Sequence, residues 1–194
     1  MSWPVPTGRD CMGTLWYVAS CSLDGYRADA EGRFGWSAPS EEVHTFINDV
    51  LRNVGTYVMG RRMYETMKVW DSMPAGQSRA TDEYASIWDA TDKVVCSDTL
   101  PDVEMRRATL EPRLTVERLE KLVESTDGVV SVDGPTTAAP ALRAGLVDEL
   151  HLFVVPQVVG GGLRALPDGA RLTFALADER RFENGTVYLR YRRP

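Results

Sequence analysis

Cysteine and histidine are scarce in this 194-residue sequence, and neither occurs in a metal-binding pattern. The three cysteines, Cys11, Cys21 and Cys96, are odd in number and lack CxxC spacing, while His44 and His151 belong to no HxE or PCxxC motif. These counts argue against a disulfide framework, a zinc site and a zinc-dependent deaminase. We therefore expect no bound metal. The cysteine pattern and an N-terminus without an apolar leader segment favour a cytoplasmic location.

An excess of positive charge and a long apolar run are also missing. The 22 Lys and Arg residues are outnumbered by 28 Asp and Glu residues, which gives a formal net charge of -6. Nucleic acids and anionic membranes attract proteins through surplus Lys and Arg, and a bilayer-spanning helix needs about 20 mostly apolar residues. We expect neither a nucleic-acid nor a membrane partner, so any phosphate site must be formed locally.

The order of predicted elements indicates the fold class. A chain of 194 residues fits a single domain, residues 1–194. Short β-prone runs predict strands at 14–20, 56–59, 93–96, 129–132 and 149–155. Apolar residues at helical spacing predict helices from 40 to 54, over 61–67, around 84–88, over 116–123 and from 134 to 145. Because helices and strands alternate, we expect an α/β fold with a mostly parallel central sheet and flanking helices.

Two details near the C-terminal end refine this expectation. Pro140 is tolerable in its helix only if it lies in the first turn, because proline lacks the N–H that later turns require. The β-prone runs 172–176 and 186–191 flank an Asn184-Gly185 turn, so we expect an antiparallel hairpin to complete the sheet.

Two glycine-containing turns, each between a predicted strand and a predicted helix, are candidate phosphate sites. A helix N-terminus presents unpaired N–H groups, and glycine lets a phosphate approach the backbone closely. The first turn, Gly60-Arg61-Arg62, adds two guanidinium groups that suit the 2′-phosphate of NADPH. The second turn, 134–137, adds two threonine hydroxyls. Neither turn matches GxGxxG or GxxxxGKS/T, and a solvated loop or an ordinary capped helix start is the alternative for each.

Four motifs in order sharpen this hypothesis. TYVMGRRMYE, residues 56–65, resembles the strand, turn and helix with which dihydrofolate reductases hold the adenosine-phosphate end of NADPH. SLDG at 22–25, Gly-Pro-Thr at 134–136 and GLVDEL at 145–150 resemble the reductase domain of the bifunctional deaminase-reductases of riboflavin biosynthesis and their stand-alone relatives. The resemblance extends over roughly residues 14–191 and implies a dihydrofolate-reductase-like fold.

The resemblance also implies a set of site residues. Contacts to the cofactor phosphates would come from Gly60, Arg61, Ser97, Gly134, Pro135, Thr136 and Thr137. Trp36 would lie near the nicotinamide, and Arg52 would hold a substrate phosphate, unless it is a solvated helix arginine. Asp24 and Glu42 are the catalytic candidates, with a turn residue and a helix-start acid as the respective alternatives.

The sequence departs from the resemblance at three positions. Asp133 stands where this superfamily usually has the first glycine of a pair, and Val132 stands where the riboflavin enzymes have a substrate-binding Glu. Asp98 would repel a phosphate if its side chain faced the site.

We conclude from the sequence that the chain is an NADPH-dependent reductase of a small pterin-, pyrimidine- or flavin-related heterocycle. The alternative is a non-catalytic nucleotide-binding or regulatory domain of the same fold, since the substrate-side residues are those that depart. The resemblance to the stand-alone relatives also implies a homodimer.

Overall fold

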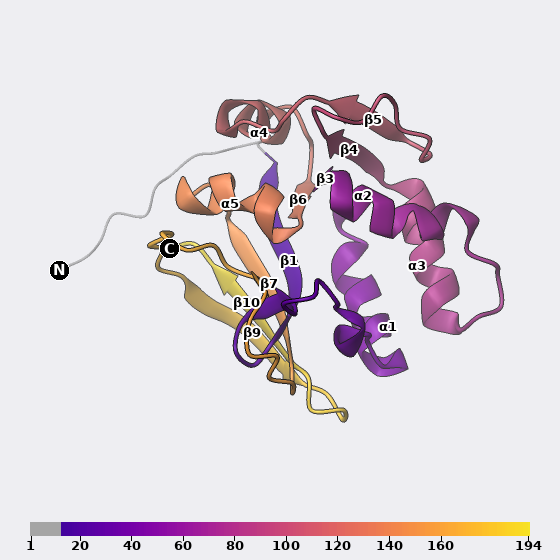
Figure 1. The fold of residues 1–194 in the computed structure, drawn as a ribbon, viewed down its shortest axis with the longest axis vertical. Coiled ribbons are helices and arrows are strands. Elements are labelled where there is room, and N and C mark those ends of the chain that lie inside the picture. Colours follow the sequence, from indigo (N-terminus) through magenta and orange to yellow (C-terminus); the bar gives the residue numbers. More distant parts are fainter. Residues whose placement is uncertain (1–12) are drawn as a thin grey trace.

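An eight-stranded β-sheet forms the centre of the molecule (Figure 1). The computed structural model describes residues 13–194. In chain order the strands are β1 (Thr14–Ser22), β3 (Val54–Gly60), β4 (Asp92–Cys96), β5 (Ala108–Glu111), β6 (Val129–Asp133), β7 (Glu149–Val155), β9 (Ala175–Arg181) and β10 (Val187–Arg192). Their spatial order is β5-β4-β3-β6-β1-β7-β10-β9, and the first six are parallel. β10 runs antiparallel to both β7 and β9.

Helices cover both faces of this sheet. They are α1 (Glu41–Leu51), α2 (Arg61–Met67), α3 (Arg79–Ala90), α4 (Val116–Glu124) and α5 (Pro135–Arg143), with short 3-10 helices η1 (Gly35–Ser37) and η2 (Lys68–Ser72). Figure 1 shows α1, α2 and α3 on one side and α4 and α5 on the other. Tyr57 of β3 packs with Trp88 of α3 in one core cluster, and Val132 of β6 packs with Leu142 of α5 in another. The predicted α/β architecture with a mostly parallel sheet is confirmed.

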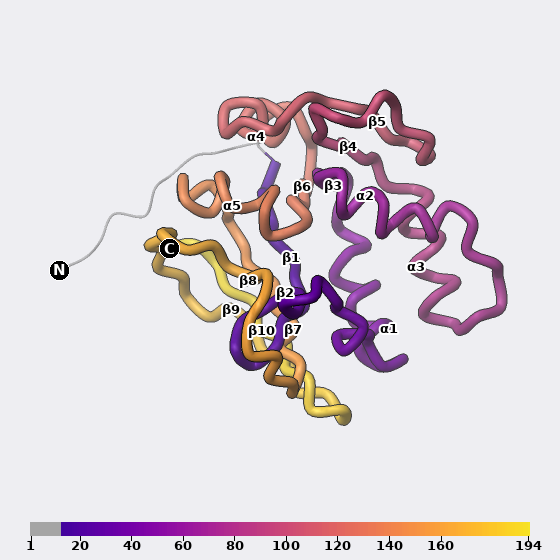
Figure 2. Tube along the Cα trace, viewed as in Figure 1, coloured from indigo at the N-terminus to yellow at the C-terminus, as the bar shows by residue number. Residues whose placement is uncertain are grey.

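A second, two-stranded sheet joins the loop after β1 to a segment far along the chain. β2 (Tyr26–Ala28) pairs antiparallel with β8 (Leu163–Arg164), and Figure 2 shows the two side by side. Gly162 permits this approach, since a Cβ atom there would clash with the carbonyl oxygen of Ala28. The sequence did not predict this sheet, because a three-residue strand has too short a pattern to recognise.

The start of α1 follows its sequence signals, whereas its end does not. Ser40 is the N-cap and accepts a hydrogen bond from the Val43 N–H at 3.4 Å, and Glu41 and Glu42 lie in the positive first turn. The helix ends at Leu51, and Gly55, expected to end it, instead lies inside β3.

The expectation for Pro140 is wrong. Pro135 occupies the first turn of α5, and Pro140 lies in the helix interior. Thr136, the residue whose carbonyl would have accepted the missing N–H, is exposed, so water can satisfy that oxygen.

The C-terminal hairpin is confirmed, but its first strand is β9 rather than residues 172–176. Its turn contains Asn184-Gly185, with Gly185 at φ 83° and its N–H donating to the Phe182 carbonyl at 3.0 Å. β9 was missed because it is the exposed edge of the sheet. All seven residues are exposed, and four in succession, 178–181, are charged, which hides the alternation used to recognise strands.

No helix within residues 13–194 has both the length and the apolar character needed to cross a membrane. Cys21 and Cys96 are buried free thiols, and Cys11 lies outside the described residues.

Candidate functional site

A cavity of about 390 Å³ opens at the carboxyl ends of β1, β3 and β6. In doubly wound α/β folds ligands bind outside this end of the strands. Its walls are mostly apolar and aromatic, and they include Val18, Phe34, Ile47, Met59, Met63, Met67, Trp70, Tyr84, Trp88 and Phe153. Such walls with a few convergent polar groups are typical of sites for small, flat molecules.

Asp133 is the acidic residue of this cavity. It is the last residue of β6, and its Oδ1 accepts a hydrogen bond from the Ser131 hydroxyl at 3.0 Å. Burial of the carboxyl raises the pKa of Asp133 to about 7, although the Ser131 hydrogen bond and the charge of Arg27 both lower it. Asp133 is therefore a group that can change charge close to neutral pH.

Arg27 of β2 brings a positive charge to the same cavity. Its guanidinium carbon lies 5.1 Å from the centre of the Phe34 ring, a cation–π arrangement. Its Nη1 is buried and has no hydrogen-bond partner among the described residues. Desolvation lowers the pKa of Arg27, but a guanidinium titrates so high that it stays charged at neutral pH.

Two tyrosines add polar atoms to the cavity. The Tyr57 hydroxyl is buried without a hydrogen-bond partner among residues 13–194. Burial raises the pKa of Tyr57 and of Tyr84, so both phenols stay protonated and can donate hydrogen bonds.

The two glycine-containing turns lie next to each other in space. Met59 of β3 pairs with Asp133 of β6, so the following residues, Gly60 and Gly134, begin α2 and α5 side by side. A Cβ atom on Gly60 would lie 2.6 Å from the Thr137 Oγ1. Gly134 has φ 85°, a conformation that favours glycine. Neither helix start has a side-chain cap, which leaves backbone N–H groups free to bind an anion.

Arg61 and Arg62 are both exposed at this point of α2. The Arg61 Nε donates to Glu65 at 2.7 Å, and its Nη1 donates to the Thr99 hydroxyl at 3.1 Å. Arg62 forms no ion pair with a described residue. Thr99 follows β4, whose last residue pairs with Gly60, so Arg61 connects the ends of two adjacent strands.

Ser97 also follows β4, and its hydroxyl accepts the backbone N–H groups of Thr99 and Leu100, each at 3.1 Å. Asp98 is directed to Arg113, which it meets through an ion pair of 3.1 Å and a backbone hydrogen bond of 2.9 Å. The charge of Arg113 thus offsets the repulsion that Asp98 would exert on a bound phosphate.

The cofactor candidates on α5 and η1 differ in their position relative to the cavity. Gly134 and Pro135 line it, whereas Thr136 is exposed on the first turn of α5. Trp36 does not line it, although its neighbours Gly35 and Ser37 do, and its ring nitrogen donates to the Arg33 carbonyl at 3.1 Å.

The two catalytic candidates, Asp24 and Glu42, are not among the residues that line the cavity. Asp24 accepts backbone hydrogen bonds from Val159 at 3.2 Å and Gly160 at 2.7 Å, which ties the SLDG turn to the glycine-rich loop at 160–162. Glu42 accepts the Glu183 N–H at 3.1 Å beside the C-terminal hairpin. A catalytic role for either requires it to leave these partners, so that role stays a prediction.

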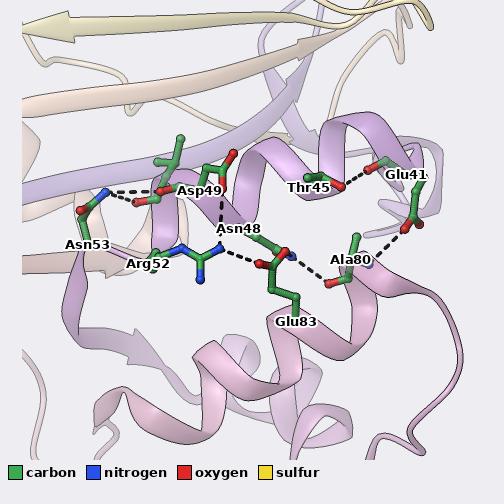
Figure 3. Close-up of polar contacts among 9 residues, drawn as sticks. Glu41, Thr45, Asn48, Asp49, Arg52, Asn53, Ala80 and Glu83 are labelled. Carbon is green, nitrogen blue, oxygen red and sulfur yellow. Dashed lines mark hydrogen bonds and ion pairs between the residues drawn. The ribbon is translucent and has the colours of Figure 1, made fainter.

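Arg52 lies at the end of α1 and points toward α3, as Figure 3 shows. Its Nη2 donates to Glu83 at 2.6 Å and lies 3.6 Å from Asp49. The buried Asn48 donates to the same Glu83 at 3.1 Å and to the Ala80 carbonyl at 2.8 Å. Arg52 does not line the cavity but borders a separate depression between the start of β3 and α3, so its predicted substrate contact remains a prediction.

Sequence reasoning missed Arg27, Tyr57 and Asp133 as site residues. Asp133 carried a detectable signal, because a carboxylate replaced an expected glycine at the end of a strand. The sequence held no signal for Arg27, because a single arginine in an irregular segment matches no motif. Tyr57 had the pattern of an ordinary core strand residue.

Residues 14–188 of this chain match the sequence model of the RibD C-terminal domain family. The chain belongs to this family. A comparison with curated proteins found no match. Members of this family and dihydrofolate reductases are also among its structural neighbours, which establishes the dihydrofolate-reductase-like fold.

Three solved structures are similar to this chain in fold. A protein from Shewanella sp. PV-4 assigned to riboflavin biosynthesis has 22% identity and a TM-score of 0.74, with 93% of this chain and 99% of that one covered. The deaminase/5-amino-6-(5-phosphoribosylamino)uracil reductase of Thermotoga maritima has 14% identity and a TM-score of 0.67, with 94% and 57% covered. Dihydrofolate reductase from Enterococcus faecalis, complexed with NADP(H), has 14% identity and a TM-score of 0.63, with 94% and 98% covered.

Proposed function

We propose that this RibD C-terminal domain protein is an NADPH-dependent reductase of a small pterin-, pyrimidine- or flavin-related heterocycle. The observation that carries the proposal is the position of the two uncapped helix starts, at Gly60 and Gly134, beside a largely apolar cavity that contains Arg27 and Asp133. Helix starts suit phosphates, and the cavity suits a flat ring.

The residues at the helix starts fit a dinucleotide phosphate. The close approach of Gly60 to Thr137 leaves no room for a side chain, and Gly134 adopts a conformation that favours glycine, so the two turns can present backbone N–H groups together. We propose that Gly60, Gly134, Pro135, Thr136 and Thr137 hold the pyrophosphate.

The adenosine end would be held by charge. Arg61 and Arg62, with Ser97 on the adjacent strand end, would contact the 2′-phosphate that distinguishes NADPH from NADH. Arg61 already has two partners, so Arg62 is the more available of the two guanidinium groups. Trp36 would border the nicotinamide end.

NADPH would supply a hydride, and the protein would orient the substrate ring and supply one proton. Asp24 and Glu42 remain the proposed proton donors under the condition that they turn toward the cavity. Asp133 needs no such movement to reach the substrate ring, because it already lines the cavity.

The second candidate is a non-catalytic nucleotide-binding or regulatory domain. It is favoured by the backbone hydrogen bonds that hold the Asp24 and Glu42 carboxylates outside the cavity. Under this alternative, the chain would bind NADPH and reduce nothing.

One pair of measurements tests both candidates. Calorimetric titration with NADPH and with NADH should give clearly tighter binding of NADPH. A screen of NADPH oxidation against pterins, aminopyrimidines and flavins should then reveal turnover. Equal affinity for the two dinucleotides would contradict the cofactor assignment, and tight NADPH binding without turnover would favour the non-catalytic domain.

We also propose a homodimer that resides in the cytoplasm. β9 is an edge strand with exposed residues on both faces, including Leu176, and such edges commonly pair with a second chain. Light scattering at micromolar concentration should give about twice the 21.6 kDa mass of the chain.

A further inference from the structure

Arg27 and Asp133 carry opposite charges into one cavity without forming an ion pair. They come from different sheets, since Arg27 belongs to β2 and Asp133 ends β6. Each side chain affects the pKa of the other. The guanidinium nitrogens of Arg27 nevertheless lie more than 4.0 Å from the carboxylate oxygens of Asp133, so the two described side chains form no ion pair.

Both groups have unused hydrogen-bonding capacity. Arg27 Nη1 is buried and lacks an acceptor among the described residues. Asp133 accepts the Ser131 hydroxyl at one of its two oxygens, Oδ1. An unsatisfied buried donor is costly, so Arg27 would be stabilised by an acceptor bound in the cavity.

The opposite charges of Arg27 and Asp133 restrict the kind of ligand that can supply this acceptor. A plain anion would satisfy Arg27 but would be repelled by Asp133, and a plain cation would meet the opposite difficulty. A neutral group that has an acceptor beside a donor satisfies both residues. On a ring, a carbonyl next to an N–H is such a group, and the aromatic walls at Phe34 and Trp70 suit its planar shape.

We infer that Arg27 and Asp133 together position the substrate ring: Arg27 donates to a ring carbonyl oxygen, and the Asp133 carboxylate accepts the adjacent ring N–H. This inference rests on the proposed function, because it places the substrate ring in this cavity. It also gives the departure at position 133 a purpose, since glycine there could not accept a hydrogen bond through a side chain.

The inferred contact should depend on pH through Asp133. The ionisable groups of the surrounding elements that face or influence it are Tyr17, Cys21, Arg27, His44, Tyr57 and Tyr84. Burial raises the pKa of the three tyrosines and of the thiol, and it lowers that of His44. Asp133 is thus the group expected to change charge near pH 7, and its protonation removes the negative charge that strengthens the hydrogen bond from the ring N–H.

The test uses pteridine-2,4-dione and its 1,3-dimethyl derivative, which keeps the carbonyl oxygens but has no ring N–H. Fluorescence titrations at pH 6 and pH 8, with and without NADPH, would compare wild type, Asp133→Asn and Arg27→Met. Arg33→Met and Asp98→Asn are matched controls, because their side chains pair with Asp29 and Arg113 outside the cavity lining. Melting curves would confirm that each variant folds.

At pH 8 the wild type should bind the dione about tenfold or more tightly than the dimethyl derivative, as expected for a hydrogen bond to a charged group. Asp133→Asn should lose the pH dependence and reduce this discrimination, because its amide oxygen is a neutral and weaker acceptor, and Arg27→Met should weaken the binding of both compounds. The controls should behave as wild type. A purely structural role for Asp133 would not change the discrimination between the two compounds.

Several outcomes would overturn the inference. These are no binding of either compound to wild type, equal binding of both, or unchanged binding in both cavity variants. NADPH binding, measured in the same samples, separates this failure from failure of the proposed function. Wild type that binds NADPH but not the dione contradicts only the assigned pair, whereas wild type that does not bind NADPH contradicts the cofactor proposal.

Discussion

Gly60 and Thr137 approach each other so closely that a Cβ atom on Gly60 would lie 2.6 Å from the Thr137 Oγ1. This contact joins the start of α2 to the first turn of α5, and it places the two candidate phosphate turns side by side. Packing against the Thr137 side chain therefore disfavours a larger residue at position 60, independently of any ligand.

Gly60→Ala should destabilise the protein by about 1–3 kcal/mol, because overpacking at a tight contact displaces its neighbours. Thr137→Ala removes the opposing oxygen, so the double variant Gly60→Ala, Thr137→Ala should recover much of the loss. Urea unfolding of the four proteins measures this coupling. Additive effects of the two substitutions would show that the contact is not the cause.

Replacement of Arg61 and Arg62 by Met should weaken NADPH binding and leave NADH binding nearly unchanged. Loss of one charge-assisted hydrogen bond costs about 1.5–3 kcal/mol, or roughly 10- to 100-fold in affinity. Calorimetric titration of both single variants and the double variant would measure it. Arg106→Met, whose side chain pairs with Asp89 instead, is the control. An equal loss for both dinucleotides would contradict a contact to the 2′-phosphate.

Asp24→Asn should destabilise the loop at 160–162, because Asp24 accepts hydrogen bonds from the backbone N–H groups at its start. A contact from Ser22 and the N–H groups of Gly160 and Val159 lower the pKa of Asp24 below its ordinary 3.8. A lowered pKa stabilises the fold above the unfolded-state pKa, and that stability is lost as the pH falls through the folded-state value. The variant should thus melt earlier than wild type at pH 7, with a smaller difference near pH 3.

Kinetics with a turned-over substrate distinguish this role from catalysis. A catalytic acid contributes about 10²–10⁴-fold to kcat, so Asp24→Asn and Glu42→Gln would show a large loss and a changed pH profile if either donates the proton.

Asp133→Asn should stabilise the protein at pH 8. The pKa of Asp133 is about 7 in the folded protein and 3.8 in an ordinary environment, so the folded state holds its proton more strongly. An acid whose pKa is raised by folding makes the unfolding free energy fall as the pH rises through 7. Asparagine does not ionise, so the variant lacks this fall. Melting curves should show a higher Tm for Asp133→Asn at pH 8 and convergence with wild type toward pH 4. A lower Tm of the variant at pH 8 would contradict the view that the buried Asp133 carboxylate destabilises the fold. Residues that serve function often lower stability in this way.

His151 should have the opposite effect over the same pH range. Burial, with the charges of Arg190 and Arg192, lowers the pKa of His151 to about 4. Glu149 lies 3.2 Å from its Nε2, but the same carboxylate is also paired with Arg192. The folded state thus resists protonation of His151, and this residue alone should lower the unfolding free energy by about 3 kcal/mol as the pH falls from 6.5 to 4.

His151→Gln removes this ionisation, so its unfolding free energy should rise relative to that of wild type as the pH falls below 6.5. Urea unfolding at pH 7.5, 5.5 and 4.5 measures the slope. A slope as steep as that of wild type would show that other groups cause the acid sensitivity.

Asn48 should matter more than Arg52 to the contact between α1 and α3. Asn48 is fully buried and hydrogen bonds to the Ala80 carbonyl, which Asn48→Ala would leave without this partner, at a cost of about 1–3 kcal/mol. Arg52 is exposed, so Arg52→Met should cost less than about 1 kcal/mol even though it breaks the ion pair with Glu83. Denaturant unfolding would rank the two. A larger loss for Arg52→Met would contradict this reading of Figure 3.

The sequence by itself determined the parallel core of the fold. Buried strands such as β7 consist of apolar runs, and α1 has its N-cap Ser40 and an apolar stripe, so local patterns were sufficient for both. The glycine turns at 60 and 134 were also visible, because a glycine between a strand and a helix is itself a local signal.

Only the tertiary structure decided which residues share the cavity. Arg27 and Asp133 meet because β2 folds back beside the sheet while β6 lies between β1 and β3, and no local pattern encodes that order. The same applies to Asp24, whose partners at 159–160 are distant in sequence. Side-chain identity sets what a residue can do, whereas burial, charge and hydrogen bonds come from neighbours that folding brings together.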